Sequence, residues 1–274
     1  MKRIDVWAVA AVVGMVVLLL GVPAVTFAQT DEIQVYDGGL AAPGIFNLTW
    51  HNNFTPKGLK TPAFPGAVVA DKSFNGVTEF ALGVTDWFEA GLYLPLYSRD
   101  DDAGWGLDGF KLRALFAVPH ADDRRFFYGA NFEFSINANR WDERRLTSEV
   151  RPIIGWHLKP VDIIINPIVD TSYDGLKNLE FVPAARVAYN FPSGLALAVE
   201  EYSDFGPLHG FLPGSEQAHQ FYGVVDKSWN EWDIEAGVGV GVTDGSDRLT
   251  VKLIVSRDLN RKPSAKTSPS RARP

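Results

Sequence analysis

The chain has 274 residues with 26 Lys and Arg against 33 Asp and Glu, a formal net charge of −7, and no cysteine. The lack of cysteine excludes a disulfide framework, a thiolate metal site and thiol chemistry. The acidic balance argues against a nucleic-acid partner. Stability must then come from burial and sheet pairing.

The first 28 residues have the pattern of a secretory leader. Lys2 and Arg3 give a positive start, an apolar run covers 7–20, and Thr26-Phe27-Ala28 is a small-x-small cleavage site. We expect cleavage after Ala28. The alternative is an uncleaved membrane anchor, for which this apolar run is somewhat short.

Downstream of the leader, apolar and polar residues alternate in stretches of about ten. In the stretch 248–258, Leu249, Val251 and Leu253 alternate with Thr250 and Lys252. A period of two places the two sets on opposite faces of a β-strand. One face is continuously apolar and the other carries charges, which is typical of a transmembrane β-barrel.

The whole chain beyond the leader divides into about twelve such strands, although the boundaries leave a ten- or fourteen-stranded closure open. We predict an all-β, up-and-down antiparallel transmembrane barrel with a polar lumen over residues 44–260, preceded by a periplasmic N-terminal segment, 29–43. The expected strands are 44–54, 74–85, 87–97, 108–118, 125–137, 146–157, 161–170, 178–189, 195–203, 217–226, 232–243 and 248–258.

The connections between these strands alternate in length. Tight turns are expected around Asp86, 120–123, 158–160, 190–194 and 227–231. Longer loops are expected at 55–73, 98–107, 138–145, 171–177 and 204–216, and the short connection 244–247 alone breaks the alternation. Barrels of the bacterial outer membrane have short periplasmic turns and longer outer loops. We therefore expect an outer-membrane location with both termini in the periplasm.

Aromatic residues gather near the ends of the expected strands, as in the interfacial belts of membrane barrels. Trp87, Trp156 and Trp229 lie beside tight turns, whereas Trp105 and Trp141 lie beside long loops. Three prolines exclude a strand in the first long loop. That loop is long enough to fold into a pore, or to act as an external cap. We expect the first and fifth long loops to filter solutes.

The C-terminal residues 261–274 contain five basic residues and no acid, with several Pro and Ser. This composition predicts a disordered, solvated tail. Outer-membrane barrels usually end on an aromatic strand that the insertion machinery reads. Here the tail follows the last strand, so the insertion signal would be internal, at Val251, Leu253, Val255 and Leu259.

Two stretches resemble a known family. The first runs Ala81-Leu82-Gly83-Val84-Thr85-Asp86-Trp87-Phe88-Glu89-Ala90-Gly91-Leu92. The second is Gly237-Val238-Gly239-Val240-Gly241-Val242-Thr243 followed by Ser246-Asp247-Arg248-Leu249-Thr250-Val251. Both resemble the outer-membrane transporters grouped as the phenol-degradation MetA-pathway family. The resemblance implies a twelve-stranded barrel that moves hydrophobic or aromatic small molecules.

If the apolar face of each strand meets lipid, the charged face must line the lumen, because a base at mid-membrane depth costs roughly 2–4 kcal/mol in lipid. Eight acids and five bases are expected inside, and several must pair across neighbouring strands. These residues are Glu89, Lys111, Arg113, Glu133, Glu149, Arg151, Asp162, Asp170, Glu180, Arg186, Glu200, Glu235 and Lys252.

We expect this lumen to support passive or facilitated passage of small solutes, with a modest preference for cations or neutral polar molecules. The expected partners are outer-membrane lipid, an unidentified small-molecule solute and the barrel-insertion machinery. The first alternative is a non-conducting structural or adhesive barrel, filled by salt bridges and working through its outer loops.

The third hypothesis is a barrel-embedded lipid hydrolase, which needs a hydroxyl and a histidine close together. None of the five histidines, His51, His120, His157, His209 and His219, has a spacing to serine that places both on one strand face. A cross-strand pair stays open. We expect no enzymatic activity, and the sequence contains no cofactor or metal-binding motif.

Overall fold

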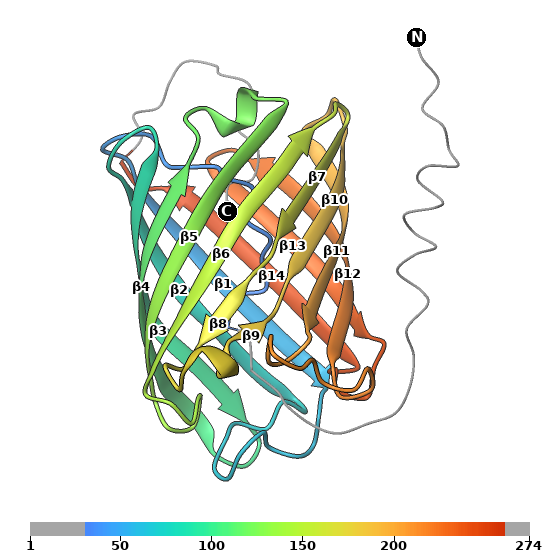
Figure 1. Cartoon of the computed structure of the whole chain (residues 1–274). Coiled ribbons are helices and arrows are strands. Elements are labelled where there is room, and N and C mark those ends of the chain that lie inside the picture. The colour runs from blue at the N-terminus through green and yellow to red at the C-terminus, as the bar shows by residue number, and fades with distance from the viewer. Residues whose placement is uncertain (1–30, 261–274) are drawn as a thin grey trace.

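A computed structural model describes residues 31–260, so the predicted leader and basic tail lie outside the described residues. One antiparallel sheet closes into a barrel because β1 pairs with β14 (Figure 1). The strands are β1 (Phe46–Lys57), β2 (Ser73–Gly83), β3 (Phe88–Asp100), β4 (Gly104–Ala117), β5 (Phe126–Asn137), β6 (Leu146–His157), β7 (Val161–Asn166), β8 (Val169–Thr171), β9 (Glu180–Phe181), β10 (Ala184–Asn190), β11 (Leu195–Asp204), β12 (Ala218–Trp229), β13 (Trp232–Gly241) and β14 (Leu249–Asp258).

The prediction of a twelve-stranded all-β barrel is confirmed. The seventh expected strand is β7 followed by β8, and the eighth is β9 followed by β10. Pro167 and Pro183 stand at these two interruptions. Proline has no backbone N–H to donate to a sheet, so each strand breaks there and resumes.

Burial follows the predicted period of two. In β14, Thr250, Lys252 and Ile254 are at most 4% exposed, whereas Val251 and Leu253 on the other face are 38% and 39% exposed. The buried set points into the barrel and the exposed set covers its outside. The outer face is apolar around the barrel, with Trp50, Phe80, Leu112, Phe132, Val187, Val199 and Val238 exposed.

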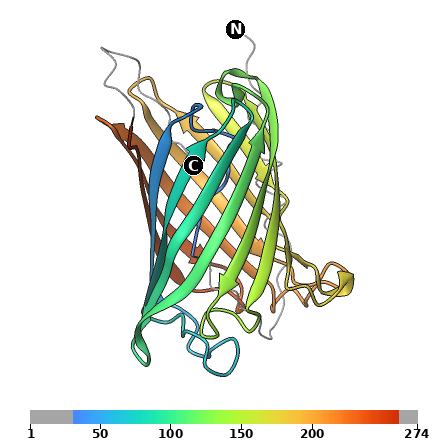
Figure 2. The same ribbon diagram turned by 90° about the vertical axis from the view of Figure 1, so that its left-hand side faces the viewer.

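The two ends of the barrel differ in their connections (Figure 2). We call the end where β1 begins and β14 ends the terminal end, and the opposite end the loop end. The terminal end has the connections 84–87, 118–125, 158–160, 191–194 and 230–231; the loop end has 58–72, 101–103, 138–145, 172–179, 205–217 and 242–248. Short 3-10 helices occur at η1 (Ala121–Asp123) and η2 (Leu176–Asn178).

One predicted loop is wrong. Residues 98–107 were expected to form a long connection, but β3 continues to Asp100 and β4 starts at Gly104. Asp100 Oδ1 accepts a hydrogen bond from the Ala103 backbone N–H at 2.5 Å, which closes a tight turn. Gly104 has a φ of +69°, a conformation that glycine adopts without steric cost.

The long connection 58–72 is hydrogen-bonded to two other connections of the loop end, 242–248 and 138–145. Its Leu59 N–H donates to Asp247 Oδ1 at 2.9 Å, and its Val68 N–H donates to the Arg140 carbonyl at 2.9 Å. Burial raises the pKa of Asp247, a residue of the connection 242–248, while the bond from Leu59 opposes that rise. Among the described residues, no helix is long and apolar enough to cross a membrane.

Candidate functional site: a filled lumen

The interior of the barrel contains the chain's own N-terminal segment. We call residues 31–41 the lumenal segment. All but two of them are buried, and Tyr36 is 1% exposed. The sequence predicted that residues 29–43 form a periplasmic segment, whereas residues 31–41 of that stretch lie inside the barrel and Ala42 and Pro43 are exposed. The segment leaves at the terminal end, where Gly44 N–H donates to the Gly83 carbonyl at 2.7 Å before β1 begins.

Two buried cations of the barrel wall bind the backbone of this segment. Lys252 on β14 donates from Nζ to the Ile33 carbonyl at 3.0 Å. Arg151 on β6 donates from Nη1 to the Gln34 carbonyl at 2.9 Å. Hydrogen bonds from charged donors are stronger than neutral ones. They also satisfy carbonyls that would otherwise be buried without partners.

Two asparagines complete this attachment. The Asn166 amide accepts from the Tyr36 N–H at 2.7 Å and donates to the Tyr36 carbonyl at 3.0 Å, as a neighbouring strand would. Asn53 donates to the Asp31 carbonyl at 3.0 Å. The four wall residues come from β1, β6, β7 and β14. The segment is therefore held from well-separated parts of the barrel.

Side chains of the segment also pack in the lumen. The Tyr36 and Tyr93 hydroxyls are 2.5 Å apart, and the Arg151 guanidinium lies 4.5 Å from the centre of the Tyr36 ring. Tyr36 and Val35 join an apolar cluster with wall residues that include Leu115, Phe127 and Ile153. The lumen thus has apolar patches beside its charged groups.

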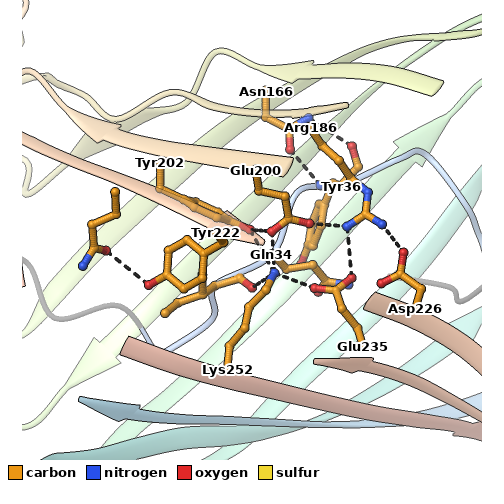
Figure 3. Close-up of polar contacts among 12 residues, drawn as sticks. Gln34, Tyr36, Asn166, Arg186, Glu200, Tyr202, Tyr222, Asp226, Glu235 and Lys252 are labelled. Carbon is orange, nitrogen blue, oxygen red and sulfur yellow. Dashed lines mark hydrogen bonds and ion pairs between the residues drawn. The ribbon is translucent and has the colours of Figure 1, made fainter. Parts of the chain in front are cut away.

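The first charged cluster lies on the wall formed by β10–β14 (Figure 3), and we call it the Arg186–Lys252 cluster. Lys252 Nζ is 2.5 Å from both Glu200 and Glu235. Arg186 forms ion pairs with Glu200, Asp226 and Glu235. These pairs join five different strands, so they tie this wall together without help from the lumenal segment.

The second cluster lies on the opposite strands, and we call it the Lys111–Arg151 cluster. Its members are Glu79 on β2, Glu89 on β3, Lys111 and Arg113 on β4, Glu133 on β5, and Glu149 and Arg151 on β6. Arg113 is 2.5 Å from both Glu79 and Glu89, and Arg151 is 2.7 Å from Glu149. Lys111 pairs with Glu133 at 3.3 Å and with Asp31 of the lumenal segment at 2.8 Å.

The lumenal segment also buries a carboxylate without a partner. Glu32 is 3% exposed, yet neither of its carboxylate oxygens has a hydrogen-bond partner among the described residues. Placing an unpaired charge in a protein interior carries a large desolvation penalty. The segment is therefore held by its backbone and by the Asp31 and Tyr36 side chains, whereas the buried Glu32 carboxylate destabilises it.

Three of the residues predicted for the lumen, Asp162, Asp170 and Glu180, lie outside both clusters. Asp170 on β8 and Glu180 on β9 face each other in register, and neither forms an ion pair with a described base. Nine other residues predicted for the lumen lie in the clusters: Glu89, Lys111, Arg113, Glu133, Glu149, Arg151, Arg186, Glu200 and Lys252. Glu235, also expected inside, joins the first cluster, and Asp162 pairs with His157 at 2.7 Å.

Glu32, Tyr36, Glu79 and Asp226 are among the interior residues that were not predicted for the lumen. Glu79 and Asp226 alternate in phase with other inward residues of their strands, so the same period of two identifies them. Glu32 and Tyr36 belong to a short stretch whose placement depends on the closed barrel. Within residues 31–260, no group of three or more His, Asp or Glu side chains is arranged to hold a metal ion.

No protein-family model and no curated protein matches the chain. Among solved structures, it is similar to an outer membrane channel from Pseudomonas putida F1, with 14% identity, a TM-score of 0.56, and coverage of 83% of this chain and 100% of that one. The NanC porin is 11% identical, with a TM-score of 0.49 and coverage of 78% of this chain and 100% of that one. OprD from Pseudomonas aeruginosa is 13% identical, with a TM-score of 0.36 and coverage of 77% of this chain and 66% of that one. The fold is that of bacterial outer-membrane β-barrel proteins.

Proposed function

We propose that this chain is an outer-membrane barrel for passive or facilitated passage of small solutes, and that its lumenal segment is a displaceable plug. The observation that carries the proposal is the combination of backbone attachment and the unpartnered Glu32 carboxylate in that segment. In this proposal both termini face the periplasm. The apolar outer face contacts outer-membrane lipid, and the insertion machinery places the barrel there.

The barrel does not depend on the segment for closure, so its sheet stays closed when the segment is displaced. The strands pair around the full circumference, and the ion pairs of the Arg186–Lys252 cluster are made between strands. Leaving the lumen also relieves the burial of Glu32. The segment loses several hydrogen bonds, but water replaces most of their energy, because a typical hydrogen bond contributes only about 1 kcal/mol net.

The solute class follows from what the segment would uncover. Acids outnumber bases among the inward residues, so the emptied lumen would favour cations or neutral polar molecules. Leu115, Phe127 and Ile153 would then be apolar patches beside these charges. Such mixed walls also suit small aromatic molecules, which is the class implied by the resemblance to the MetA-pathway transporters.

A second candidate function is a non-conducting structural barrel. It is favoured by the complete burial of Lys252 and Glu200, both 0% exposed, because water does not reach these side chains while the segment is in place. In that case the outer loops would be the working surface. The two candidates differ in what happens when the segment is removed.

Single-channel recording in planar bilayers separates them. We would compare the full chain with a variant in which residues 31–36 are replaced by six Gly and Ser residues, which keeps the chain length. The proposal predicts a mostly closed full-length barrel and frequent, discrete conductance steps in the variant. Silent membranes with both proteins, after heat-modifiable gel mobility has confirmed folded barrels, would favour the structural role.

A further inference from the structure

A polar group interrupts the apolar outer face at the loop end of β11. Leu197 and Val199 are 44% and 59% exposed and point outward. Because side chains alternate along a strand, Glu201 and Ser203 continue the same outward face. Ionisable residues on the lipid-facing side of a membrane protein are costly and therefore indicate function. This group is separate from both charged clusters of the lumen.

The Ser203 hydroxyl is within hydrogen-bonding distance of a histidine on the neighbouring strand. Ser203 and His219 are directly opposite in the β11–β12 register, and Ser203 Oγ is 2.6 Å from His219 Nδ1. The Ser203 hydroxyl donates a hydrogen bond to the Glu201 carboxylate, which also lies 3.6 Å from Nδ1. This is the cross-strand hydroxyl–histidine pair that the sequence spacing left open.

The other side of the imidazole is held by an amide. Gln217 donates from its side-chain nitrogen to the Leu212 carbonyl at 2.7 Å, which turns its oxygen toward His219 Nε2 at 3.0 Å. An amide oxygen only accepts hydrogen bonds, so Nε2 must carry a proton. In the neutral imidazole, Nδ1 is then the unprotonated nitrogen that faces Ser203, and it accepts the hydroxyl hydrogen when the hydroxyl rotates from Glu201 to Nδ1. That is the tautomer a general base needs.

We propose that Ser203 is the nucleophile and His219 the general base of an ester-hydrolysing site on the outer face of the barrel, with Gln217 as the positioning residue. The substrate class is an acyl ester of a membrane lipid. The site faces outward beyond the apolar Leu197 and Val199, and the Phe205 ring packs edge-on against the imidazole at 5.2 Å.

The chemistry balances without a cofactor. His219 Nδ1 takes the Ser203 hydroxyl proton as Oγ bonds to the ester carbonyl carbon, and the alcohol leaves with that proton as the ester C–O bond breaks. Nδ1 then takes a proton from water, and the resulting hydroxide attacks the acyl-serine carbon. Ser203 Oγ recovers the proton and the fatty acid is released.

Access to the site runs beside the connection 205–217. The side chains of His219 and Glu201 are 19% and 25% exposed, whereas Ser203 is 7% exposed. Leu212 of this connection lies against Gly206, where a Cβ would meet its side chain at 2.5 Å. A shift of the connection would uncover the Ser203 hydroxyl to a lipid approaching from the membrane.

The competing explanation is a structural ion pair. A doubly protonated His219 would bond Ser203 and Gln217 while its charge is balanced by Glu201, and the hydroxyl would donate to Glu201. The same contacts hold in that state, but Ser203 would then not be activated. The two explanations differ in whether Ser203 reacts as a nucleophile.

The test is covalent labelling of the folded full-length protein in micelles with a fluorophosphonate probe, followed by mass spectrometry of the labelled peptide. Hydrolysis of p-nitrophenyl octanoate is measured in parallel. We expect label on Ser203, and hydrolysis reduced by about 10²-fold or more in Ser203→Ala and His219→Asn. Ser193→Ala, in an exposed turn at the terminal end, is the matched control and keeps the full rate.

Gln217 supplies a second readout that a purely structural role would not move. Gln217→Ala should lower kcat about tenfold with little change in KM and shift the pH–rate profile. Gln217→Glu keeps the acceptor oxygen and should restore most of the rate. The proposal is overturned if folded wild-type protein shows no label on Ser203, or if its hydrolysis equals that of Ser203→Ala.

Discussion

The two charged walls of the lumen differ in how they use the lumenal segment. In the Arg186–Lys252 cluster the bases pair with acids of other strands, and the segment adds only the Ile33 carbonyl. In the Lys111–Arg151 cluster the segment supplies the Asp31 carboxylate and the Gln34 carbonyl. One wall is complete by itself, and the other is completed by the segment.

Unsatisfied buried atoms gather near the second wall. They include both carboxylate oxygens of Glu32, Nδ1 of His51 and Oδ1 of Asn131. Buried polar groups without partners are costly. Buried charge thus has two roles in this barrel: the first wall joins strands to one another, and the second holds the lumenal segment while several buried polar atoms lack partners.

The largest expected effect comes from breaking the first wall. Lys252→Met leaves Glu200 and Glu235 with Arg186 as their remaining basic partner, and removing one partner of a buried ion network typically costs about 3–5 kcal/mol. Chemical unfolding of the barrel in vesicles measures this loss. The control is Arg248→Met, which breaks an exposed pair with Asp244. Equal stability of the two variants would contradict a structural role for the first wall.

The next largest effect is expected at Glu32, the unpartnered carboxylate of the lumenal segment. Glu32→Gln removes a buried charge that has no partner and should stabilise the plugged state by about 1–3 kcal/mol. Openings in planar bilayers should become rarer than in wild type. Glu143→Gln, at an exposed carboxylate of the connection 138–145, should leave the opening frequency unchanged. More frequent openings in Glu32→Gln would mean that this carboxylate holds the segment in place.

A smaller effect is expected at the tyrosine pair. Tyr36→Phe removes the hydrogen bond to the Tyr93 hydroxyl, a loss of about 1 kcal/mol, which corresponds to about a fivefold higher opening frequency. The control is Tyr128→Phe, which changes an outward ring that is 58% exposed. An unchanged opening frequency in Tyr36→Phe would mean that the Tyr36–Tyr93 hydrogen bond does not help to hold the lumenal segment.

The smallest effect is expected at the loop end, away from both walls. Burial raises the folded-state pKa of Asp247, so its ionised form disfavours folding and wild-type stability should increase as the pH falls through that raised pKa. Asp247→Asn keeps an acceptor for the Leu59 N–H and should lack this pH dependence. At pH 7 we expect a change of less than about 1 kcal/mol. Unfolding midpoints of both proteins are measured between pH 4 and 7. Parallel pH profiles would contradict a contribution of Asp247 to the pH dependence of stability.

The parts of the fold that were predictable depend on local pattern. The alternation around Lys252 assigns the inner and outer faces of β14 because the side-chain period of a strand is fixed. Pro167 and Pro183 mark the interrupted strands for a similarly local reason. The turn at Asp100 was missed because a side-chain hydrogen bond to Ala103 closes it, and the strand pattern does not encode that bond.

The interior arrangement required the closed barrel. The hydrogen bond between Lys252 and Ile33 joins residues 219 positions apart, and the pair Ser203 and His219 meets only because of the β11–β12 register. Residues 31–36 alternate like a short strand, but nothing in that stretch alone specifies that its partners are side chains from several walls. Local periodicity therefore predicts the cylinder but not what fills it.

The most direct test of the central claim is a reversible lock on the lumenal segment. The chain has no cysteine, so Tyr36→Cys with Asn166→Cys introduces one possible disulfide. The two residues are already neighbours, because the Asn166 side-chain amide bonds the Tyr36 backbone N–H and carbonyl at 2.7 and 3.0 Å. Tyr36→Cys alone is the control. The account predicts that the oxidised double variant stays closed in planar bilayers. Reduction should restore openings at a frequency above that of the single variant, because the Asn166 amide no longer bonds the backbone of residue 36. Equal conductance before and after reduction, with the disulfide confirmed by mass spectrometry, would contradict the claim that this segment controls passage.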